Sequence, residues 1–101
     1  MAYRRRILPR AESELKEIVT YLCDILGSPS AARSFLGNFT GQLAALCEHP
    51  FMRSLSHLPE LAALGYRSAP VGNYLFLYRV IDNWVVVAHV FHQSQDYARL
   101  V

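Results

Sequence analysis

Side chains that can bind phosphate and move protons gather in the last third of the chain: Arg67, Arg79, His89, His92, Tyr97 and Arg99. Histidine changes charge near neutral pH, and arginine forms paired hydrogen bonds with phosphate oxygens. Together these types could supply a base, an acid and a phosphate clamp. His49 and His57 fall in predicted loops, and we expect no catalytic role for them.

The same side chains also have structural interpretations. His92 could cap a sheet through a hydrogen bond with Asp96, and Asp96 could hold Arg67 or Arg79 in an ion pair. Such pairs belong to the architecture of a protein as often as to its chemistry. The residue types alone therefore leave catalysis and structure open.

Composition predicts one folded domain, residues 1–101, because 52% of the residues are hydrophobic and 18% are charged. The net charge of +2 is too small to indicate nucleic-acid binding by itself. No signal peptide or membrane-length apolar run is visible, so we expect a cytoplasmic protein without a membrane partner. Cys23 and Cys47 lie beside apolar helix stripes and lack metal-site spacing. We expect no metal and no cofactor.

The elements that must position these side chains begin with a strand and two helices. A short strand at residues 3–8 precedes Pro9, which suits the first turn of a helix that Gly27 ends. Ser28 and Pro29 form the start signal of a second helix, which runs to Pro50. The short connection predicts an antiparallel helix hairpin. For residues 51–64 we expect a loop with one short helical turn.

The last third reads as three antiparallel strands near residues 66–71, 74–81 and 84–91. Gly72-Asn73 and Asp82-Asn83 are typical two-residue hairpin turns. The predicted fold is therefore α+β in the order β-α-α-β-β-β. Its helix hairpin packs on one face of a mostly antiparallel sheet.

Two-residue turns also predict which side chains share a face of the sheet, because side chains alternate along a strand. One predicted face carries Tyr66, Leu75, Leu77, Arg79, Val86, Ala88, Val90 and His92. The other carries Arg67, Tyr74, Phe76, Tyr78, Val87, His89 and Phe91. A covered face seldom holds an unpaired arginine, so we expect the aromatic face to be open to a protein or RNA partner. The alternative is an ordinary core layer with Arg67 at its wet edge.

Over nearly its full length the chain resembles the ParE/RelE toxin superfamily of type II toxin–antitoxin systems. The resemblance is carried by "ILPRAESELKEIVTYL", "SPSAARSF", "CEHPFM", "LGYRS", "NYLFLYRV" and "VFHQSQDYARL". It implies a bacterial toxin in a heteromeric complex with a cognate antitoxin, bound at the sheet edges and along the helix that carries Phe35, Phe39 and Leu43.

The superfamily implies two mechanisms. RelE-like members are endoribonucleases, or mRNA interferases, that cut mRNA on the ribosome, whereas ParE-like members bind DNA gyrase and have no known hydrolytic chemistry. Many RNA-cleaving relatives have an arginine where this chain has Leu75, and its tail "HQSQDYARL" is similar to the ParE type. The resemblance thus favours a ParE-like growth inhibitor, with target contacts at Arg67, Tyr74, Phe76, Tyr78, His89, His92, Gln93 and Asp96.

Two alternatives remain open. An endoribonuclease would use Arg67, Arg79, His92 and Tyr97. A decayed toxin would act only as an antitoxin-binding module.

Overall fold

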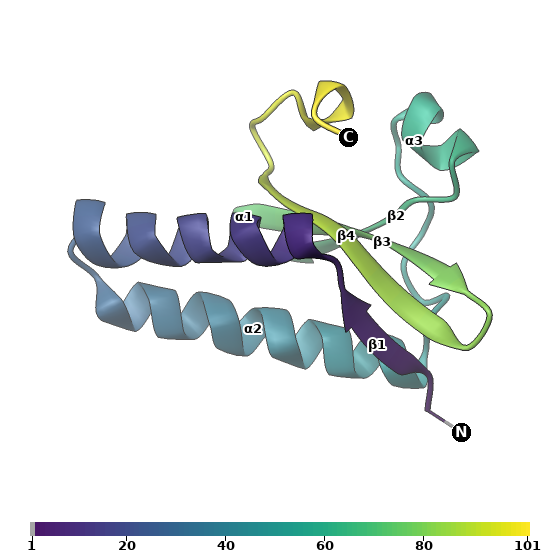
Figure 1. Ribbon diagram of the computed structural model, residues 1–101, viewed down its shortest axis with the longest axis horizontal. Helices are drawn as coiled ribbons and strands as arrows, with labels where there is room; N and C mark the ends of the chain where they lie inside the picture. The colour runs from purple at the N-terminus through teal and green to yellow at the C-terminus, as the bar shows by residue number, and fades with distance from the viewer. Residues whose placement is uncertain (1) are drawn as a thin grey trace.

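The computed structural model describes residues 2–101, and Figure 1 shows its arrangement. The elements are β1 (Arg4–Ile7), α1 (Pro9–Thr20), a π-helical segment (Tyr21–Ile25), α2 (Pro29–Glu48), α3 (Pro59–Ala63), β2 (Arg67–Val71), β3 (Tyr74–Ile81), β4 (Trp84–His92) and a 3₁₀ turn (Tyr97–Arg99). The sheet order is β1-β4-β3-β2, with β1 parallel to β4 and the other pairs antiparallel. This confirms the predicted α+β fold and its mostly antiparallel sheet.

The helix hairpin forms where the sequence signals lie. Pro9 stands in the first turn of α1, and Gly27 has a φ of 61°, which suits a residue without a Cβ. The Ser28 hydroxyl accepts a hydrogen bond from the Ala31 amide at 3.2 Å and so caps α2. The π-helical segment continues α1 toward Gly27. A helical turn also occurs in the predicted loop, as α3.

The two hairpin turns have the predicted lengths. Val71 pairs with Tyr74 and Ile81 pairs with Trp84, and Gly72 and Asp82 have φ values of 59° and 54°. The register shifts once, however. Leu77 pairs with His89 and Tyr78 pairs with Val87, which leaves Ala88 as the extra residue of a β-bulge.

Two hydrophobic clusters lie on opposite faces of the sheet. On the helix face, α1 and α2 pack against the sheet and enclose Phe76, Tyr78, Val85, Val87 and Val90. On the outer face, the α3 region and the C-terminal turn cover Leu75, Leu77, Ala88 and Phe91. Figure 1 shows α3 and the C-terminal turn together, away from the helix pair.

The predicted assignment of the faces is therefore wrong. The aromatic set of β3 packs under the helices, and the aliphatic set of Leu75 and Leu77 faces outward. In addition, the bulge moves His89 and Phe91 to the outer face and places Val90 and His92 on the helix face, because one extra residue reverses the alternation. None of the helices in residues 2–101 is long and apolar enough to cross a membrane.

Candidate functional site

The aromatic residues of β3 belong to the core. Phe76 and Tyr78 are 0% exposed. The Phe76 ring meets the Phe39 ring edge-on at 5.1 Å between ring centres, and Tyr74 meets Phe35 at 5.0 Å. Phe76 and Tyr78 therefore do not form an open target-binding face, and the half-buried Tyr74 lies at the edge of this cluster.

The predicted antitoxin groove is closed for the same reason. Phe35, Phe39 and Leu43 are 6%, 2% and 1% exposed, because this stripe of α2 packs on the sheet of its own domain. Burying these side chains gives the domain its main hydrophobic stabilisation, so a partner cannot contact them without unfolding the hairpin. The stripe is covered by the sheet of its own domain, and antitoxin binding at these residues stays a prediction.

Arg67 lies at the edge of the helix face, in register with Tyr78. Its guanidinium donates a 2.7 Å hydrogen bond to the Arg53 carbonyl and lies 5.0 Å above the Phe51 ring. The Tyr78 hydroxyl donates to the Pro50 carbonyl at 2.9 Å, and burial raises the pKa of that hydroxyl against the lowering effect of Arg67. Arg67 thus fastens the loop after α2 to the sheet.

The bulge in β4 is held from α1. β1 ends beside Val87, so the edge of β4 beyond that point has no strand partner. There Glu14 of α1 accepts a 3.0 Å hydrogen bond from the Val90 amide, and His89 Nδ1 lies 3.4 Å from the same carboxylate oxygen. Glu14 and His89 are each 13% exposed at the side chain. The carboxylate therefore satisfies a buried amide that the sheet leaves open.

The outer face connects His89 to the C-terminal turn through stacked rings. His89 stacks on Phe91 at 5.1 Å between ring centres, and Phe91 stacks on Tyr97 at 5.8 Å. Tyr97 is 5% exposed, and burial raises the pKa of its hydroxyl. This arrangement identifies Tyr97 as a packing residue that closes half of the outer face.

The tail after β4 is tied by its own polar side chains. His92 Nδ1 accepts from the Ser94 amide at 3.1 Å and lies 2.7 Å from the Ser94 hydroxyl. Gln93 Nε2 donates to the carbonyls of Gly72 and Tyr74, so it joins the tail to the first hairpin turn. Asp96 pairs with Arg99 at 3.3 Å. The predicted partners of Asp96, namely His92, Arg67 and Arg79, are not its partners among the described residues.

The four residues proposed for RNA cleavage do not converge. Arg67 lies at the helix-face edge of β2, whereas Arg79 lies on the outer face above the Tyr66 ring, at 5.0 Å. His92 packs edge-on against Tyr74 on the helix face, and Tyr97 lies in the outer cluster. A general acid–base pair must reach one reacting group from a common side. This geometry provides no common side for the four.

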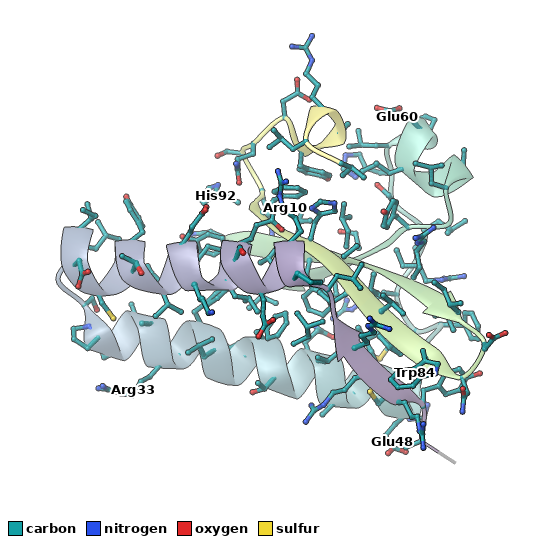
Figure 2. The ribbon with its side chains drawn as sticks, viewed as in Figure 1. Arg10, Arg33, Glu48, Glu60, Trp84 and His92 are labelled. Atoms are coloured by element: carbon teal, nitrogen blue, oxygen red, sulfur yellow. The ribbon has the colours of Figure 1, made fainter. Side chains whose placement is uncertain are left out.

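A polar cleft of about 500 Å³ lies between α1 and the C-terminal tail. Its lining includes Arg10, Glu14, Glu17, His92 and Gln95, and Figure 2 shows Arg10 and His92 on this side of the molecule. Arg10 pairs with Glu14 at 3.8 Å. Sequence reasoning missed this cleft, because only the tertiary fold brings α1 beside the tail.

A second hollow, of about 390 Å³, lies on the uncovered half of the outer face. We call it the arginine hollow; its lining is Arg6, Leu8, Arg79, Ile81, Trp84 and Val86. Arg4 stands at its rim, with its guanidinium 5.4 Å from the centre of the Trp84 ring. The alternation of Arg4, Arg6 and Leu8 along one strand was the available sequence signal, since alternate residues share a face.

Comparison with known proteins identifies the family. The family model "ParE toxin of type II toxin-antitoxin system, parDE" matches residues 6–97. No curated protein sequence matches the chain. Several solved structures share the fold, and two of them come from toxin–antitoxin systems. One is the chromosomal ParDE system from P. aeruginosa, with a TM-score of 0.71, 15% identity, and coverage of 90% of this chain and 96% of that chain. The other is the toxin–antitoxin complex RelBE2 from Mycobacterium tuberculosis, with a TM-score of 0.61, 22% identity, and coverage of 91% and 99%.

The two likenesses support the fold alone, because both identities are low. The family match is more specific, since it runs from within β1 to the first residue of the C-terminal turn. It therefore spans every element described above. The chain belongs to the ParE toxin family of type II toxin–antitoxin systems.

Proposed function

We propose that this toxin inhibits growth by binding DNA gyrase in the cytoplasm, without cutting RNA. One observation carries the proposal. The candidate nuclease residues Arg67, Arg79, His92 and Tyr97 point to different faces or are engaged in packing. A toxin of this family without an assembled acid–base site acts by binding its target. Membership of the ParE family agrees with gyrase as that target.

A cognate antitoxin neutralises this toxin in a heteromeric complex. The RelBE2 structure is that of a toxin–antitoxin complex. In this chain, the apolar side chains that a partner helix could cover lie around the end of the helix hairpin: Tyr21, Ile25, Leu26 and Leu36, which are 46%, 71%, 56% and 38% exposed. This patch supports helix docking there in place of the closed Phe35 and Phe39 stripe.

The test is to induce the toxin without an antitoxin and to assay gyrase and mRNA in the same cells. We expect covalent gyrase–DNA complexes to accumulate while mRNA ends stay as in uninduced cells. Purified toxin should also inhibit supercoiling by gyrase in the absence of ribosomes. Codon-linked mRNA cuts with normal gyrase activity would contradict the proposal in favour of an endoribonuclease. Unimpaired growth would indicate a decayed toxin.

A further inference from the structure

The arginine hollow combines an apolar floor with cations that the domain leaves unpaired. Leu8, Val86 and Trp84 are half-buried, and Ile81 is 43% exposed. Among residues 2–101, the ion pairs of arginine are Arg10 with Glu14 and Arg99 with Asp96, so the arginines of the hollow take part in none. The fold thus leaves the apolar floor partly exposed and the arginines of the hollow without an ion-pair partner among the described residues.

Arg79 is the deepest of these cations. Its Nε is buried and finds no hydrogen-bond partner in the described part of the chain. Its guanidinium stacks on Tyr66, which fixes the direction in which it points. A buried, unsatisfied donor costs roughly 1–3 kcal/mol, or more when charged, so a negative charge that a ligand brings close to this guanidinium would be favoured. The charge of Arg6 on β1, which lies across Val86 of β4 from Arg79, adds to this preference for an anion.

The edge of β1 borders the hollow. It is bonded at one end, where the Tyr3 amide donates to the Cys47 carbonyl, and is open from there to Ile7. The Arg4 amide donates to the Asn83 carbonyl and the Leu8 amide donates to the Val87 carbonyl. Because these groups alternate in direction along a strand, the amides and carbonyls of Arg5 and Ile7 point away from β4. An extended peptide could pair with them and place one of its side chains over the hollow.

We propose that the arginine hollow binds an acidic peptide segment that carries one large apolar side chain. The apolar side chain occupies the floor of Leu8, Ile81 and Val86, and flanking carboxylates meet Arg6 and Arg79. A floor built mainly of aliphatic side chains favours a peptide over a nucleic acid, which would need a platform of several rings. The volume suits one such side chain with its neighbours. This inference goes beyond the proposed function and does not depend on gyrase being the target.

The probe is a short fluorescein-labelled peptide of alternating Glu and Asp around one central Phe, titrated into the full chain. The chain has a single tryptophan, Trp84, whose emission reports directly on the hollow. We expect saturable binding with a shift of that emission. Because a like-charge contact replaces an attractive one, Arg6→Glu should weaken binding by about tenfold or more. Ile81→Ser should weaken it through loss of the floor.

Arg33→Glu is the matched control, because it makes the same charge change at an exposed position of α2, far from Trp84 in Figure 2. It should bind the peptide like the parent chain. Equal weakening by Arg6→Glu and Arg33→Glu would overturn the proposal, as would a peptide with Ser in place of Phe that binds equally well. Tighter binding of an oligothymidylate of equal charge would overturn it in favour of nucleic acid. Unchanged Trp84 emission at saturation would overturn it too. Growth assays of the same variants test the proposed function separately.

Discussion

Glu14 stabilises the domain by supplying the acceptor that the β4 bulge lacks. Replacing it with alanine removes the hydrogen bond to the Val90 amide and leaves that amide without a partner. Val90 is only 2% exposed. A hydrogen bond to a charged group contributes roughly 1.5–3 kcal/mol, and a buried unsatisfied donor costs a similar amount. We therefore expect Glu14→Ala to lower the free energy of unfolding by about 2 kcal/mol. The ion pair with Arg10 adds little, since Arg10 is 68% exposed.

Urea unfolding at neutral pH, followed by circular dichroism, measures this loss. For a chain of this size, about 2 kcal/mol corresponds to a fall in Tm of roughly 8–15 °C. Glu14→Gln keeps an uncharged acceptor and should lose about half as much. Glu17→Ala is the control, because it makes the same change at an exposed position of α1 and should cost less than about 0.5 kcal/mol. Equal stability of the Glu14→Ala and Glu17→Ala proteins would refute the stabilising role of the Glu14 carboxylate.

Three further predictions concern buried rings. Burial raises the pKa of Tyr78, so the stability that its neutral hydroxyl contributes is complete below the ordinary tyrosine pKa and is lost as the pH rises through the folded-state pKa. Tyr78→Phe should cost about 1 kcal/mol at pH 8 for the lost hydrogen bond to the Pro50 carbonyl. In urea unfolding from pH 8 to 11, its free energy of unfolding should fall less steeply with pH than that of the parent chain, and an equally steep fall would contradict the prediction. Phe39→Ala should cost about 3–5 kcal/mol in urea unfolding, whereas the exposed Leu36→Ala should cost little; comparable losses would contradict the packing of α2. Tyr97→Phe should keep both stability and toxicity while Tyr97→Ala loses stability, and a Tyr97→Phe protein that folds normally but no longer arrests growth would indicate chemistry at the hydroxyl.

Sequence reasoning found the order of the elements and the pairing of the last three strands, because the turn residues Gly72 and Asp82 specify loop length locally. It did not predict that β1 pairs with β4. It missed the bulge at Ala88, since the carboxylate that holds the bulge comes from Glu14 on a distant helix. Such a partner leaves no local trace in β4. The positions of His89 and Phe91 on the outer face follow from that bulge and could not be predicted without it.

The predicted assignment of the two sheet faces is wrong for a different reason. An arginine on a sheet face predicts that no helices cover that face. The Arg67 guanidinium instead reaches the edge of the helix layer, where it contacts the Arg53 carbonyl and the Phe51 ring. The charged end of a long side chain can thus lie outside the core even when its backbone position faces the core. The same reasoning explains the arginine hollow, since no local pattern shows which half of the outer face the C-terminal turn leaves uncovered.

The covering of the outer face bears on the proposal that this toxin binds its target and does not cut RNA. Leu75 occupies the strand position at which the family resemblance implies an arginine in many RNA-cleaving relatives, and it is 7% exposed within the cluster that contains Leu61 and Tyr97. RNA that displaced Tyr97 to reach that position would expose Phe91 and forfeit roughly 1.5–3 kcal/mol for each large apolar side chain returned to water. Leu75 carries no charge that could offset this loss by attracting the RNA. A partner that binds on the uncovered half of the outer face does not expose these apolar side chains. This difference favours recognition of a protein surface over cleavage of RNA.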